Sequence, residues 1–117
     1  MATNAERQME GAKNQAFFRD VNERVAEVSP EQRETLQVLC ECADKGCVAG
    51  LAIKREDYDA IRRIPTHFPV KPHHVVREIE RVVERLDGYW VVEKFGESGK
   101  AAIELDPRRR DAGTADS

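Results

Sequence analysis

The chain has 117 residues, a length that suits one domain, and its 22 acidic residues outnumber its 19 basic ones to give a formal net charge of -3. Because 40% of the residues are hydrophobic and no apolar run approaches the roughly 18 residues of a membrane span, neither a membrane protein nor a wholly disordered chain is expected. The acidic balance argues against binding of nucleic acid or an anionic membrane over the whole surface. The first residues lack the basic and apolar pattern of a secretory signal, so we expect a cytoplasmic protein.

The first predicted element is a helix over residues 5–28. Its apolar side chains follow a spacing of three and four residues and share one face: Phe18, Val21, Val25 and Val28. We expect this face to pack on the domain or, in a second interpretation, to pair with another copy, while Arg19 and Asn22 lie on the rest of the helix. Ser29 and Pro30 resemble the start of a further short helix, or of one that bends away from the first, since serine caps helices and proline suits the first helical position.

The rest of the chain alternates short strand and helix patterns. Alternating or short apolar runs predict strands over residues 35–40, 48–53, 67–70 and 89–95. Helical spacing predicts helices over residues 55–63 and 97–105. The stretch 75–86 fits either a helix, by its apolar stripe, or a hairpin strand, by its β-branched residues and the Asp87-Gly88 turn that follows.

Both outcomes for that stretch give an α+β fold, with an N-terminal helix followed by a small antiparallel sheet and one or two packed helices. We expect a helical arm at residues 1–34 and a zinc-binding α+β domain at residues 35–105. Residues 106–117 are polar, with no apolar residue beyond alanine, which predicts a disordered tail.

The three cysteines lie close together in the sequence, as Cys40, Cys42 and Cys47. An odd number of cysteines in a chain without a secretory signal is a poor framework for disulfides. Cys40 and Cys42 would point to the same side of an extended segment, and a turn at Lys45-Gly46, where the glycine is able to take a positive φ angle, would return Cys47 toward them. Three thiolates so placed supply three corners of a tetrahedral site for zinc.

The fourth ligand must come from elsewhere in the chain, and the candidates are His74, His73 and His67, in that order. Pro72 stiffens the approach to the first two. Asp44 lies inside the cysteine loop, but a carboxylate is a less usual partner for three thiolates. We therefore expect a metal site formed by Cys40, Cys42, Cys47 and His74, with Zn²⁺ as the ion.

Two resemblances bear on this site. The run from Cys40 to Cys47, with Gly50 after it, is similar in spacing to the post-SET zinc loop of histone methyltransferases, which takes its fourth ligand from a distant segment. Since no SET-domain motif is present, this resemblance implies zinc binding alone.

A second resemblance covers most of the chain. The segments 14–24, 80–85 and 89–94, together with the cysteines and the Pro72 region, resemble a group of small uncharacterised bacterial proteins. Members of that group have Pro-Gly-His where this chain has Pro72, His73 and His74. The resemblance therefore implies His74 as the ligand and carries no function with it.

These observations favour a small, zinc finger-like accessory or regulatory interaction protein that is not an enzyme, because no phosphate-binding loop or nucleophile motif is present. We expect a protein partner, or self-association through the N-terminal helix, and no membrane contact. One alternative is a redox or metal sensor in which thiol oxidation releases zinc. Another is a weak nucleic-acid binder, disfavoured because acidic residues are interleaved with the basic ones. If the metal site were open, Glu41 or Asp44 would be the candidate base for a bound water.

Overall fold

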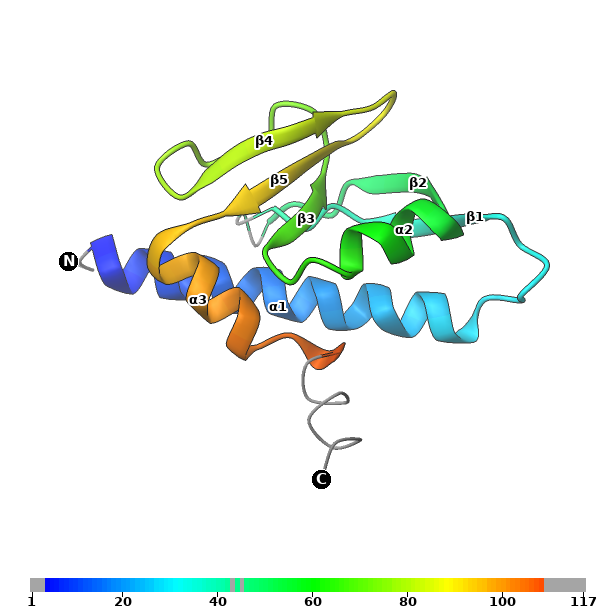
Figure 1. Cartoon of the computed structure of the whole chain (residues 1–117), viewed down its shortest axis with the longest axis horizontal. Coiled ribbons are helices and arrows are strands. Elements are labelled where there is room, and N and C mark those ends of the chain that lie inside the picture. The colour runs from blue at the N-terminus through cyan, green and yellow to red at the C-terminus, as the bar shows by residue number, and fades with distance from the viewer. Residues whose placement is uncertain (1–3, 43, 45, 109–117) are drawn as a thin grey trace.

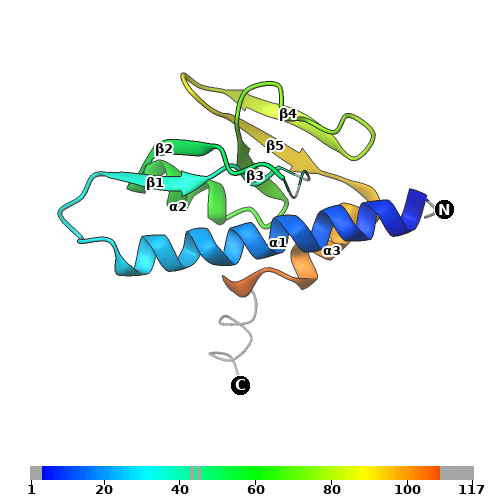
Figure 2. The same ribbon diagram turned by 180° about the vertical axis from the view of Figure 1, so that it is seen from behind.

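A computed structural model describes residues 4–42, 44 and 46–108 of the chain and confirms the α+β fold (Figure 1). The elements, in chain order, are α1 (Asn4–Val28), β1 (Thr35–Leu39), β2 (Gly50–Lys54), α2 (Arg55–Arg62), β3 (His67–Val70), β4 (Glu80–Arg85), β5 (Trp90–Lys94) and α3 (Gly96–Glu104). Helix α1 runs along one side of both sheets and contacts β1 and α3 (Figure 2).

The strands form two small antiparallel sheets. Strands β1 and β2 pair with each other, and β3, β5 and β4 form a second sheet in that order. Along β1 the buried residues alternate with less buried ones, so that Leu36 faces Ile53 and Val38 faces Leu51 across the pair. These four side chains enter the apolar core, which they share with Phe68 and Val92 of the second sheet among others. The three cysteines belong to the same buried cluster.

The ambiguous stretch 75–86 contains a hairpin strand rather than a helix. Strand β4 pairs with β5, and the turn between them places Gly88 at a φ angle of 88°, which glycine adopts without strain. Leu86 completes the turn by donating its amide hydrogen to the Tyr89 carbonyl at 3.0 Å. The turn signal and the β-branched residues therefore outweigh the helical spacing.

The helix predicted at Ser29 is wrong, because this serine ends α1 instead. Its hydroxyl and its amide both donate to the Val25 carbonyl, at 2.6 and 3.0 Å. Arg55, at the start of α2, then donates to the carbonyls of Ala26 and Pro30 at 3.1 and 3.0 Å. A cation at a helix C-terminus satisfies carbonyls that the helix cannot pair.

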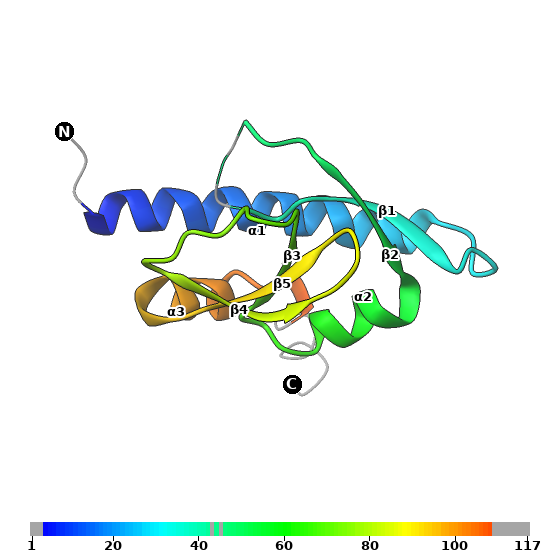
Figure 3. The same ribbon diagram turned by 90° about the horizontal axis from the view of Figure 1, so that it is seen from above.

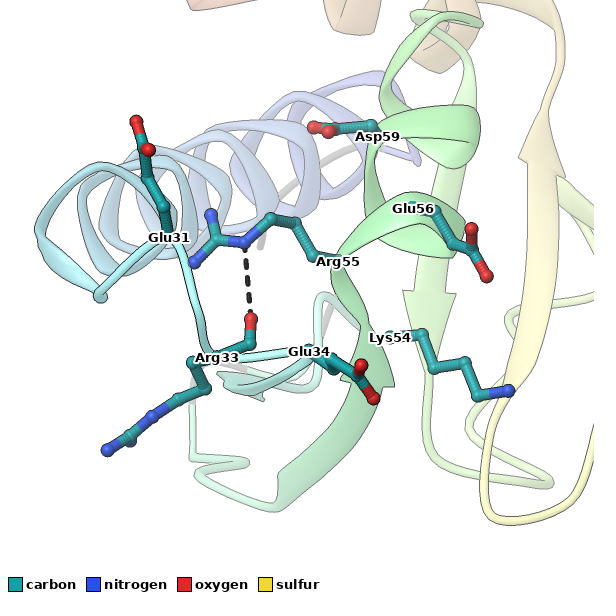
Figure 4. A pocket seen from close by; sticks show the side chains of 7 residues that line it. All are labelled: Glu31, Arg33, Glu34, Lys54, Arg55, Glu56 and Asp59. Atoms are coloured by element: carbon teal, nitrogen blue, oxygen red, sulfur yellow. Dashed lines mark hydrogen bonds between the residues drawn. The ribbon is translucent and has the colours of Figure 1, made fainter.

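In Figure 4 the Arg55 side chain points toward the Arg33 carbonyl, to which it donates a hydrogen bond. The donor and acceptor atoms are 3.4 Å apart, and the cavity at this place has a volume of about 430 Å³. Charged side chains of both signs line this cavity, among them Glu31, Glu34 and Lys54. Arg55 lies in this cavity and already donates to carbonyls at the end of α1. Its charge therefore stabilises the end of the helix, and we assign the cavity no ligand.

The buried face of α1 is polar in part, which corrects part of the predicted apolar stripe. Phe18 is buried as expected and Val25 packs against the core, but Val28 is 66% exposed, while Gln15, Arg19 and Asn22 are at most 1% exposed. These three residues follow a four-three spacing and share one face. They pack on ends of strands and loops whose carbonyl groups need hydrogen-bond donors, a requirement that valine cannot meet.

The segment after α3 begins with a buried carboxylate. Asp106, the first residue of the predicted disordered tail, is 1% exposed and accepts a hydrogen bond from Arg62 at 2.6 Å. Arg108 in turn donates to Glu23 of α1 at 2.7 Å. The remainder of the predicted tail, residues 109–117, lies outside the described residues.

Candidate metal centre

The segment after β1 aims two thiols in one direction. The Cys40 amide donates to the Ala49 carbonyl at 2.8 Å, and the next amide, that of Glu41, donates to the Pro69 carbonyl at 2.9 Å. Successive residues of an extended chain point to opposite sides, so Cys40 and Cys42 share a side and Glu41 points away from them.

Asp44 holds the loop where it returns toward the first two cysteines. The Asp44 side chain accepts the Gly46 amide hydrogen at 2.9 Å, and its carbonyl accepts that of Cys47 at 3.0 Å. An aspartate that accepts hydrogen bonds from the backbone just after it closes a turn, and this use of its side chain explains why the Asp44 carboxylate stands outside the ligand cluster.

His74 reaches the cysteines from a tight turn after β3. The His74 amide donates to the Lys71 carbonyl at 3.0 Å, Pro72 occupies the second position, and His73 has a φ angle of 74°. These features match a type II turn, in which the third residue needs a positive φ angle and is usually glycine. In Figure 3 this loop lies beside the segment that joins β1 to β2.

The structure brings together the four residues predicted as ligands. One ligand atom from each of Cys40, Cys42, Cys47 and His74 lies within 4.8 Å of the others. Nδ1 of His74 is 3.7 Å from Sγ of Cys40 and 3.5 Å from Sγ of Cys47. Bonds of about 2.3 Å to sulfur and 2.0 Å to nitrogen in a tetrahedral centre would separate such atoms by about 3.6 Å. The cluster can therefore hold a metal ion with little rearrangement.

The other two candidate histidines have different partners. Nε2 of His67 lies 3.1 Å from a carboxylate oxygen of Glu93 on the neighbouring strand. The ring of His73 packs on Trp90, with a centroid distance of 4.6 Å. Neither joins the cluster, although His73 is adjacent to the residue that does.

The pKa values of Cys40 and Cys42 are shifted in opposite directions. A hydrogen bond from Cys40 lowers the pKa of Cys42 to about 5, and the same bond, together with burial, raises the pKa of Cys40. The amide of Lys71 donates to Sγ of Cys40 at 3.1 Å and opposes that increase. Backbone donors to sulfur stabilise thiolates, the form in which cysteine binds metals.

Glu41 anchors the loop to α1 from the opposite side. Its carboxylate is fully buried and accepts hydrogen bonds from Asn22 at 2.7 Å and from Arg19 at 3.3 Å. Burial raises the pKa of Glu41, and these two donors lower it. The Glu41 carboxylate is therefore held on α1, on the side of the segment away from the sulfur atoms of Cys40 and Cys42.

Three further hydrogen bonds fix the backbone around the cysteines. Asn22 exchanges hydrogen bonds with the backbone of Leu39, at 2.8 Å in both directions, and Gln15 donates to the Glu41 carbonyl at 3.1 Å. Sequence reasoning missed this role of α1. The signals were the four-three spacing of Gln15, Arg19 and Asn22, and a carboxylate placed between two cysteines.

Comparison with known proteins gives no match to a family model, a curated protein or a solved structure. Of the helices in the described part of the chain, none has the length and apolar character that a membrane span requires. What the chain does must therefore be argued from the cysteine-histidine cluster and its surroundings.

Proposed function

We propose that this chain is a small zinc-binding accessory or regulatory interaction protein, and that its Cys3His site is structural. The observation that carries the proposal is the convergence of Cys40, Cys42, Cys47 and His74 from two separate loops. Three thiolates and one imidazole are a common donor set for tetrahedral zinc. An ion held there would cross-link the β1–β2 connection to the loop after β3, which suits a chain with a small core.

A closed site supports a structural role over a catalytic one. Catalytic zinc keeps a position open for water or substrate, whereas the four side chains gathered here would supply all four ligands of a tetrahedral ion. Burial also supports a structural role over thiol sensing, because Cys40, Cys42 and Cys47 are at most 9% exposed and an oxidant would have to open the loop first. Mild peroxide should accordingly release the metal slowly from the intact protein.

The partner is proposed to be a protein, or a second copy of this chain, bound on the outer face of α1. Phe17 is 63% exposed there although it is a large apolar residue. Such residues are frequent contact points in interfaces. Phe17→Glu should abolish association measured by light scattering, with little change in stability. We also propose a cytoplasmic location, because reduced thiols persist in that compartment.

Substitution of His74 tests the ligand set. His74→Ala should lower zinc affinity, measured by competition with a chromogenic chelator, and should remove one nitrogen ligand from the spectrum of the cobalt-substituted protein. His67→Gln is the matched control, because glutamine can still donate to Glu93 and the side chain lies outside the cluster. Equal zinc affinities for the two variants would contradict the proposal.

A further inference from the structure

A second site lies on the three-stranded sheet, on the other side of the turn that carries His74. A cavity of about 460 Å³ is lined there by Trp90 of β5, by Arg81 and Arg85 of β4, and by His73 and Arg77 from the preceding loop. This volume falls in the range of small-molecule sites. None of these side chains belongs to the metal cluster.

The charge of this cleft is positive, although the chain as a whole is acidic. Its buried carboxylate, Glu80, is paired with Lys94 at 3.1 Å, and both side chains are fully buried. Glu84 points into a different cavity on the opposite face of the sheet. Arg81 forms an ion pair with Glu93, with a donor–acceptor distance of 3.0 Å. Arg77 and Arg85 are exposed at the cleft and are the groups that an anion could contact.

An aromatic surface lies among these cations. Trp90 is partly exposed, the Arg85 guanidinium lies 5.0 Å from the centre of its ring, and the His73 ring packs against it at 4.6 Å. His73 makes this contact while holding a φ angle of 74°, a conformation that costs a non-glycine residue about 1 kcal/mol or more. Strain of this kind is concentrated at functional sites.

We propose that the cleft binds a nucleotide, either free or as one unit of a single strand, with its base stacked on Trp90 and its phosphate held by Arg77 and Arg85. A planar base and a phosphate are the two features that such a surface recognises together, since bases stack on aromatic rings and guanidinium groups pair with phosphate oxygens. An acidic peptide would use the arginines and leave the aromatic surface unused.

The chain contains one tryptophan, so its fluorescence reports on the cleft directly. The full-length protein is titrated with AMP, with tripolyphosphate, with an oligoglutamate peptide and with a short oligothymidylate. We expect AMP or the oligonucleotide to quench Trp90. Tighter binding of the oligonucleotide identifies a strand as the source of the nucleotide, and equal binding identifies a free nucleotide. Equal responses to tripolyphosphate or to the peptide would overturn the stacking part of the proposal, and so would no response to any probe.

Variants separate the cleft from the rest of the surface. Arg85→Glu should weaken binding of the labelled oligonucleotide or nucleotide, followed by fluorescence anisotropy, by about tenfold or more, and Trp90→Phe should weaken it less because phenylalanine also stacks. Arg63→Glu is the matched control, a charge reversal at an exposed arginine of the α2 end, away from the cleft lining. Equal losses in Arg85→Glu and Arg63→Glu would show general electrostatic attraction and overturn the assignment. This test reads the cleft alone, so its outcome is independent of whether zinc binds.

Discussion

Replacement of Glu41 by glutamine tests whether α1 holds the cysteine loop, residues 40–47, through the buried charge pair of Arg19 and Glu41. Glutamine keeps the shape of the side chain and one acceptor oxygen for Asn22, but it removes the charge that faces Arg19. Both members of the pair are at most 2% exposed as side chains. Breaking such a buried pair by removing one partner typically costs about 3–5 kcal/mol.

Arg19 keeps other contacts when Glu41 is replaced, so we expect a loss of stability at the lower end of the range of about 3–5 kcal/mol. Its guanidinium still lies 3.6 Å from the centre of the Phe68 ring, donates to the carbonyls of Pro65 and His67, and is 3.9 Å from an Asp106 oxygen. We therefore expect Glu41→Gln to lower the free energy of unfolding by about 3 kcal/mol, measured by urea denaturation.

Two comparisons make the reasoning refutable. Glu27→Gln is the control, because Glu27 pairs with Arg24 at 3.5 Å while both side chains are more than half exposed, and its effect should stay within about 0.5 kcal/mol. Arg19→Met combined with Glu41→Gln should cost less than the sum of the single changes, since neither charge is then left alone. A cost for Glu41→Gln no larger than that of Glu27→Gln would show that the pair does not anchor the loop.

Three further predictions concern the turn after β3, the end of α1 and the pH. Both His73→Gly and His73→Val lose the ring contact with Trp90, but His73→Gly should be the more stable of the two by about 1 kcal/mol because glycine adopts the φ angle of 74° freely; thermal unfolding of both variants decides. Arg55→Met should lower the free energy of unfolding by about 1–2 kcal/mol because it removes the donor to the Ala26 carbonyl in the last turn of α1, and Arg33→Met, at an exposed side chain nearby, should change it little. Acidification should weaken zinc binding in chelator competition, since protons compete for thiolates and imidazole; an affinity independent of pH would exclude these ligands.

The features that could be predicted from the sequence are those that depend on residues close together in the chain. The positions of β1, β5, α2 and α3 followed from apolar spacing and turn residues, within one or two residues. The four candidate ligands that the structure brings together followed from the cysteine spacing and from the preference for His74 over His73 and His67. Between His73 and His74, the decisive feature is the turn, which directs one ring to Trp90 and the next to the cysteines.

The polar interface of α1 was not predictable in this way. Arg19 and Asn22 look like solvated residues when only the helix is considered, and their burial depends on strand-end carbonyls that are distant in the sequence. Glu41 looked like a free carboxylate for the same reason. Pairing of this kind depends on tertiary contacts, which single-sequence patterns do not contain.

The metal content of the protein tests the central claim most directly. The full chain is purified under reducing conditions without added zinc, and elemental analysis is combined with quantitation of the protein. We predict about one zinc ion per chain, retained through gel filtration and lost in His74→Ala. A zinc content far below one ion per chain, with the protein folded by circular dichroism, would contradict the account.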